Sequence, residues 1–285
     1  MMKIVIGVEG LSLTPLEMDL LNTLQPFGVI LFKRNCQTPE QVKALTASIK
    51  TCVPHCQIFI DQEGGRVQRL PWRHAPALLS FEHKDIDVLY ESCLNMAQEL
   101  KNLGVDIDCA PCCDLYIEGA DPVIGDRAFS KNPKRVVELY HVWKQAFDEV
   151  GVTCMMKHIP GLGRASCDPH SHTTIISTPI DILKDNDFWV FKEICKTQEQ
   201  GGLAMTSHAI MESLDPTTPL TLSKVGIDYI RNDIGFKGTL ITDCLTMDGL
   251  EPLTLKERID RSIAAGCDIQ LISSPISKKL LDILT

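Results

Sequence analysis

The chain has 285 residues, of which 44% are hydrophobic and 23% charged, an ordinary composition for a soluble globular protein that excludes disordered and collagen-like chains. Its 28 Lys and Arg residues against 37 Asp and Glu give a formal net charge of -9, and no dense basic run predicts a nucleic-acid partner. No apolar stretch reaches the roughly 18 residues that a membrane span needs, so we expect no membrane insertion.

Short apolar runs predict the strands of the fold. Most of these runs are apolar nearly throughout instead of alternating, a pattern that is typical of strands buried on both faces of a parallel sheet. They cover residues 3–8, 28–32, 57–61, 105–111, 152–158, 203–208, 238–243 and 267–273.

Helix signals separate these runs. Thr14, Thr38 and Asn132 are each followed by Pro, which places a capping residue ahead of a proline in the first helical turn. Glycines stand just before several of the expected strands, where helix C-caps belong: Gly104, Gly151, Gly202 and Gly266. Strand and helix thus alternate eight times, which predicts an α/β fold of the (β/α)8 barrel type. We expect one barrel over residues 1–285 with a short C-terminal end; a doubly wound sheet is disfavoured because residues 7–10 lack the full glycine fingerprint.

Polar residues follow five of the expected strands. In a barrel, chemistry lies at the C-terminal ends of the strands, and although polar loop starts are common, five strands that end alike favour a site. These strand ends are residues 61–66, Asp108 with Asp114, Lys157 with His158, Ser207 with His208, and Thr242 with Asp243.

The segment 157–172 is long, rich in glycine and without helical periodicity, which is typical of a functional loop. Asp168 and His170 flank Pro169, and the proline biases Asp168 toward an extended backbone, so that the two side chains can meet. A carboxylate bonded to an imidazole fixes its tautomer, which suits His170 to acid/base chemistry; a surface His near an Asp is the alternative. Asp243 is either a nucleophile or the N-cap of the following helix.

Five motifs occur together and in a characteristic order from about residue 28 to about residue 272. They are DQEGGRVQR at 61–69, GDRAF at 125–129, KHIPG at 157–161, DPH at 168–170 and TDCLTM at 242–247. In these motifs the chain resembles glycoside hydrolase family 3, and within it the single-domain bacterial β-N-acetylglucosaminidases (β-hexosaminidases) of peptidoglycan recycling. Positions 159, 162, 169 and 244 carry Ile, Leu, Pro and Cys where this family usually has other residues.

The resemblance implies a retaining exo-β-N-acetylglucosaminidase that releases terminal N-acetylglucosamine from muropeptides. Asp243 matches the nucleophile, His170 the acid/base and Asp168 its orienting partner. The family's sugar-binding positions match Asp61, Arg69, Arg127, Lys157 and His158. The resemblance implies neither a cofactor nor a metal, and the position of His170 suggests a movable loop over the sugar.

Three other functions stay open at this point. A metal-dependent barrel hydrolase would use His158, His170, His172, His208 and Asp243, which are suitable zinc ligands. A β-glycoside phosphorylase of the same family is compatible with a histidine acid/base, because a histidine does not repel phosphate. A sugar-binding relative without catalysis would not need Asp168, His170 and Asp243 together. The sequence indicates no oligomeric state.

The 12 cysteines bear on the compartment. The apolar start of the chain is interrupted at Glu9, too early for the core of a signal peptide, and a chain of this length builds its core without disulfides. We therefore expect a cytoplasmic protein with mostly free thiols. The CxxC formed by Cys109 and Cys112 has no second CxxC to complete a metal site, which favours packed thiols.

Overall fold

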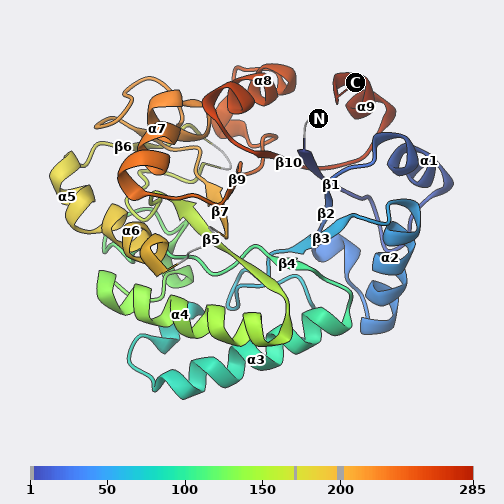
Figure 1. The fold of residues 1–285 in the computed structure, drawn as a ribbon, viewed down its shortest axis with the longest axis horizontal. Coiled ribbons are helices and arrows are strands. Elements are labelled where there is room, and N and C mark those ends of the chain that lie inside the picture. Colours follow the sequence, from blue (N-terminus) through green and yellow to red (C-terminus); the bar gives the residue numbers. More distant parts are fainter. Residues whose placement is uncertain (1–2, 170–171, 198–201, 285) are drawn as a thin grey trace.

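The computed structural model describes residues 3–169, 172–197 and 202–284. Its parallel strands close into a barrel in the order β1-β10-β9-β7-β5-β4-β3-β2, which Figure 1 shows as a ring of strands surrounded by helices. The barrel strands are β1 (Lys3–Gly7), β2 (Gly28–Leu31), β3 (Gln57–Ile60), β4 (Ile107–Asp108), β5 (Thr153–Ile159), β7 (Leu203–Thr206), β9 (Thr239–Ile241) and β10 (Ile269–Pro275). Each of them overlaps one of the expected apolar runs, and the predicted (β/α)8 barrel is confirmed.

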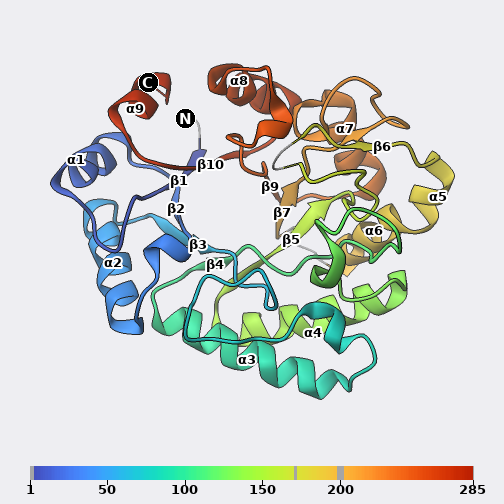
Figure 2. The ribbon, with the colours of Figure 1, turned by 180° about the vertical axis from the view of Figure 1, so that it is seen from behind.

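Helices follow the barrel strands and lie on the outside of the barrel. They are α1 (Pro15–Leu24), α2 (Pro39–Cys52), α3 (Ile86–Asn102), α4 (Pro133–Val150), α5 (Ile180–Asp185), α6 (Asp187–Thr197), α7 (Lys224–Tyr229), α8 (Leu255–Ala265) and α9 (Lys278–Leu284). The short α9 follows β10 and lies beside α1 in both views (Figures 1 and 2). No helix within the described ranges has the length and apolarity needed to cross a bilayer.

The predicted capping residues begin and end several helices. Thr14, Thr38 and Asn132 each accept a backbone N–H of the first turn of α1, α2 and α4. Gly151 and Gly266 end α4 and α8 with φ of 75° and 113°, in the left-handed region that favours glycine.

Two features between β5 and β9 differ from the expected regular alternation. A second, two-stranded parallel sheet joins β6 (Ile175–Ile176) to β8 (Ile210–Met211). The helical segment between β6 and β7 is divided into α5 and α6. Strands of two residues are too short to produce a periodic pattern in the sequence, so this sheet could not be predicted.

The apolar core has two layers, as expected for a barrel of this type. One layer fills the inside of the barrel and contains Cys109, Met155 and Met205; the other packs the outside of the strands against the helices and contains Cys112. The two cysteines of the CxxC therefore lie in different layers. All twelve cysteines have free thiols, and burial raises the thiol pKa of both Cys109 and Cys112, so the packed-thiol interpretation is confirmed.

Candidate active site

A cavity of about 470 Å³ opens at the C-terminal ends of the barrel strands, and its volume lies in the range of small-molecule sites. Segments that follow β2, β3, β4, β5 and β9 contribute to its wall, together with residues of β10 itself. The cavity is lined by most of the residues that the sequence predicts for the site, namely Asp61, Arg69, Arg127, Lys157, His158, Asp168 and Asp243. His170 lies outside the described residues.

A network of ion pairs forms one wall of this cavity. Asp61, directly after β3, accepts Lys157 Nζ at 2.9 Å and Arg69 Nη2 at 3.0 Å. Glu63 accepts Arg127 through two parallel bonds of 2.9 Å and also pairs with Lys157 at 2.5 Å. The bidentate pair holds the Arg127 guanidinium in one plane, and the contacts to Asp61 and Glu63 hold Arg69 and Lys157, so the three cations have carboxylate partners before any ligand arrives.

The network keeps its members charged despite their burial. Burial alone would raise the pKa of Glu63, but Arg127 and Lys157 outweigh it and lower the pKa to about 2. Burial likewise opposes the charge of Asp61, yet Lys157 and Arg69 hold its pKa well below the ordinary value. Burial would also lower the pKa of Lys157, and the two carboxylates instead raise it.

Asp243 follows β9 and is half-buried at the cavity. Its Oδ1 accepts the backbone N–H of Cys244 at 2.7 Å. The next α-helix, α8, is capped by Thr254 instead, so the interpretation of Asp243 as a helix N-cap is wrong. His208 supports this turn from behind, because its Nε2 donates to the carbonyl of Cys244 at 2.9 Å.

The predicted functional loop is irregular over residues 160–169 and 172–174 and brings Asp168 to the same cavity as Asp243. Its far end rests on the segment after β9: Gly249 N–H donates to the carbonyl of Pro169 at 3.2 Å, and Thr173 Oγ1 donates to the carbonyl of Gly249 at 3.1 Å. The described part of the loop is therefore docked on the segment that follows β9, at the side of the cavity that Asp168 lines.

The charges of the cavity wall nearly balance. This mixture suits an uncharged molecule with many hydroxyl groups, because carboxylates accept and cations donate hydrogen bonds at fixed positions. Phe32, Val67 and Met247 add apolar surface. The cations are Arg66, Arg69, Arg127 and Lys157, and the acids are Asp61, Glu63, Asp168, Asp243 and Asp248.

The metal-ligand set considered from the sequence does not assemble in the part of the chain that the structure describes. There the only group with metal-ligand geometry is Cys112, Asp114 and His158, and it includes neither His208 nor Asp243. His208 is bonded to Thr221 Oγ1 and to a backbone carbonyl. Of the strand ends singled out from the sequence, Asp108 and Ser207 do not line the cavity.

The sequence interpretation missed three carboxylates of the site: Asp248 at the cavity wall and the two buried side chains of Glu63 and Asp114. Glu63 lies inside the motif at 61–69, but its role depends on Arg127, which is 64 residues away in the chain. Asp114 was noted as a strand-end residue without a role, and it contacts His158 and the start of the functional loop. Burial of both side chains, which are 0% exposed, marks them in the structure.

The comparisons with known proteins agree with this geometry. The chain is 34% identical over 282 residues to a "Beta-hexosaminidase" of Nitrosomonas eutropha, covering 94% of this chain and 80% of the relative. A "Beta-hexosaminidase" of Alkalilimnicola ehrlichii is 35% identical over 285 residues, again covering 94% and 80%. A crystal structure of NagZ from Neisseria gonorrhoeae in complex with N-trifluoroacetyl-D-glucosamine superposes with a TM-score of 0.88 at 31% identity, covering 99% of this chain and 83% of that one. The family model "Glycosyl hydrolase family 3 N terminal domain" matches residues 14–285, and the chain belongs to glycosyl hydrolase family 3.

Proposed function

We propose that the chain is a retaining exo-β-N-acetylglucosaminidase that releases terminal N-acetylglucosamine from muropeptides. One observation carries the proposal: Asp168 and Asp243, which come from loops after different strands, line one cavity together with the fixed ion-pair wall. The names of the relatives and the N-trifluoroacetyl-D-glucosamine of the similar NagZ structure support an N-acetylated amino sugar as the ligand. The choice of a muropeptide as the substrate rests on the resemblance to the family. Residues 1–285 act as one catalytic unit in this proposal.

The reaction proceeds in two displacements. A carboxylate oxygen of Asp243 attacks the anomeric carbon as the bond to the leaving oxygen breaks, and the imidazolium of His170 gives its proton to that oxygen. His170 then removes a proton from water, which attacks the glycosyl-enzyme and releases the sugar with retained configuration. Asp168 orients His170, and the Asp243 carboxylate stabilises the positive charge that develops on the ring.

The ion-pair wall binds the sugar in this proposal. Asp61 is ionised and accepts hydrogen bonds from sugar hydroxyls, while Arg69, Arg127 and Lys157 donate to hydroxyl or carbonyl oxygens. His158 is the remaining sugar-binding residue of this wall. Because carboxylates of the same chain already hold the three cations, little side-chain entropy is lost when the sugar binds.

We further propose a cytoplasmic location, which the twelve free thiols support, and no requirement for a metal or cofactor. Full activity in excess chelator is expected, and its loss would favour the metal-dependent alternative. Product analysis separates hydrolysis from phosphorolysis: we expect free N-acetylglucosamine with and without phosphate, whereas a sugar 1-phosphate would identify a phosphorylase.

Asp243→Asn tests the nucleophile. We expect turnover of 4-nitrophenyl N-acetyl-β-glucosaminide to fall at least ~10³-fold, because the amide cannot form the glycosyl-enzyme. Asp260→Asn, which changes an exposed carboxylate on α8, is the control. Undiminished turnover in the Asp243 variant would exclude this assignment.

His170→Ala tests the acid. The variant should lose far more activity on alkyl glycosides, whose leaving groups need a proton, than on nitrophenyl glycosides, whose leaving groups do not. An equal loss on both substrates would contradict the acid role.

A further inference from the structure

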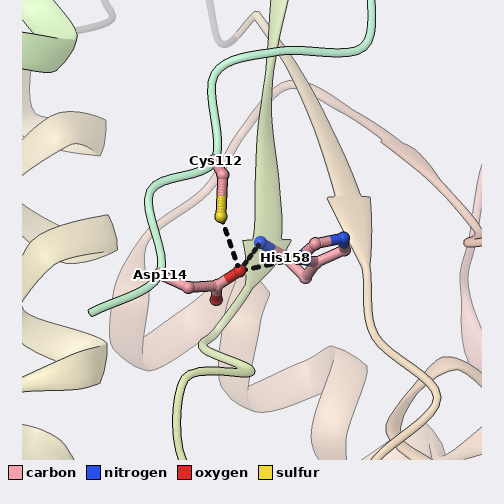
Figure 3. Close-up of side chains that lie close together, drawn as sticks. All are labelled: Cys112, Asp114 and His158. Carbon is pink, nitrogen blue, oxygen red and sulfur yellow. Dashed lines mark hydrogen bonds and ion pairs between the residues drawn. The ribbon is translucent and has the colours of Figure 1, made fainter. Parts of the chain in front are cut away.

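Asp114 lies beneath the cavity and is not assigned a role in the proposed reaction. Its side chain is 0% exposed. Its Oδ2 accepts His158 Nδ1 at 2.6 Å, the backbone N–H of His158 at 3.2 Å and the thiol of Cys112 at 3.2 Å. Its Oδ1 accepts the backbone N–H of Leu162 at 2.6 Å. Figure 3 shows the contacts to His158 and Cys112 converging on one carboxylate oxygen.

This convergence determines where the imidazole carries its hydrogen. Both backbone groups are obligatory donors, and a carboxylate surrounded by donors is an acceptor only. Nδ1 of His158 must therefore bear a hydrogen. The ring extends away from Asp114 (Figure 3), and His158 lines the cavity, so Nε2 is the ring nitrogen left for a ligand.

The chemistry of the cavity wall indicates what Nε2 should do. Arg69, Arg127 and Lys157 are donors only, whereas a sugar hydroxyl has one hydrogen to donate and two lone pairs to offer. Both oxygens of the fully buried Glu63 are engaged with Arg127 and Lys157, which leaves Asp61 as the acceptor among the members of this network. A neutral imidazole with its hydrogen on Nδ1 adds an acceptor to this wall.

Asp114 also holds the start of the loop that carries Asp168. The bond from Leu162 N–H to Oδ1 fixes the first turn after β5. Gly163 follows with its Cα so close to the backbone of Leu115 that any side chain there would collide with it. One carboxylate thus links the sugar-binding imidazole to the root of the catalytic loop.

A metal does not explain this cluster as well as hydrogen bonds do. Cys112, Asp114 and His158 are ligand types, but a metal needs a thiolate, and burial raises the pKa of the Cys112 thiol well above its usual value. Asp114 Oδ1 is also committed to the backbone of Leu162.

We propose that Asp114 is a positioning residue that holds His158 as the neutral Nδ1–H tautomer, so that Nε2 accepts a hydrogen bond from a hydroxyl of the bound sugar. The nature of the ligand rests on the proposed function; the tautomer does not. The same carboxylate sets the start of the loop that carries Asp168.

The tautomer is measured directly in the wild-type protein by long-range ¹H–¹⁵N correlation spectra of the histidine rings. His158→Gln identifies the signals of His158 by their loss. We expect a protonated Nδ1 and an unprotonated Nε2 at neutral pH. A hydrogen on Nε2, whether alone or together with one on Nδ1, would overturn the proposal without any need for a variant of Asp114.

Asp114→Asn then tests the cause. An amide has one acceptor and one donor end, and a fixed backbone N–H faces each oxygen position of Asp114. The contact from Leu162 at 2.6 Å is shorter than the one from the His158 backbone at 3.2 Å, so the amide oxygen stays with Leu162, and the amide hydrogens face the imidazole and shift its hydrogen to Nε2. We expect the reversed tautomer and binding of N-acetylglucosamine roughly 10- to 100-fold weaker by calorimetry. An unchanged tautomer together with unchanged affinity would refute the proposal.

Asp187→Asn is the matched control. Asp187 is also buried and also holds the loop, because it accepts Arg164 Nε at 2.7 Å, but among the described residues it bonds no imidazole. We expect this variant to keep the wild-type tautomer and sugar affinity and to change kcat alone; a reversed tautomer there would refute the specific role of Asp114. Absence of hydrolysis by the wild type would refute the proposed function and leave the tautomer result standing.

Discussion

Glu63→Gln is the sharpest test of the ion-pair wall. Glu63 is 0% exposed and neutralises two cations at once. Glutamine has nearly the same shape but lacks the charge, and its amide hydrogens must face either Arg127 or Lys157, both of which are donors only. The change therefore takes the carboxylate partner from Arg127 and leaves Lys157 paired with Asp61 alone.

The free energy of unfolding that Glu63→Gln should lose follows from the pKa of Glu63. Its fall from the ordinary 4.5 to about 2 on folding corresponds to about 3 kcal/mol of stability. This agrees with the roughly 3–5 kcal/mol that is lost when one partner of a buried ion pair is removed. Because the folded-state pKa is the lower one, the contribution is fully present above pH 4.5 and is lost as the pH falls from 4.5 toward 2.

The assay is urea unfolding of wild type and variant, followed by circular dichroism between pH 7 and pH 3. We expect the two free energies of unfolding to differ by about 3 kcal/mol at pH 7 and by about 1 kcal/mol at pH 3. Asp126→Asn breaks the exposed pair with Arg66 and should cost at most about 1 kcal/mol. A difference below 1 kcal/mol at pH 7, or one that does not shrink with acid, would refute the reasoning.

Three further predictions concern activity. Asp61→Asn removes the acceptor of a lysine and an arginine and should raise KM roughly 10- to 100-fold; an unchanged KM in steady-state assays would contradict its binding role. Gly249→Ala places a methyl group against the Pro169 carbonyl and should lower kcat roughly 100-fold by displacing the catalytic loop. Gly10→Ala, with open space around it, should leave kcat unchanged. Equal values of kcat in the two variants would count against loop docking. Cys244 lines the cavity, so methyl methanethiosulfonate should inactivate the wild type and spare Cys244→Ser; equal inactivation of both would place the reactive thiol elsewhere.

The barrel could be predicted because each of its strands and helix starts is marked by a short stretch of the sequence itself. Each strand is a short apolar run, and Thr14, Thr38 and Asn132 mark helix starts within a few residues of themselves. The regular alternation of strands and helices ends where tertiary contacts determine the structure. β6 and β8 have two residues each, and their pairing depends on how the loop after β5 folds back.

The site was predictable only in part, for a related reason. The cavity-lining residues lie in motifs that can be recognised one at a time. The roles of Glu63 and Asp114 depend instead on partners that are 64 and 48 residues away, respectively, and no spacing rule connects them. The tertiary structure is needed to show that these two carboxylates organise the residues that face the ligand.

The balanced lining of the cavity has a consequence for how a ligand is captured. Opposite charges a few ångströms apart cancel at distances beyond the Debye length, about 8 Å at physiological ionic strength. An uncharged sugar is therefore not steered toward the opening, and its association rate should hardly respond to added salt. The buried ion pairs that hold the wall are themselves shielded from dissolved ions, so the affinity for the sugar should also be unchanged at high salt concentration.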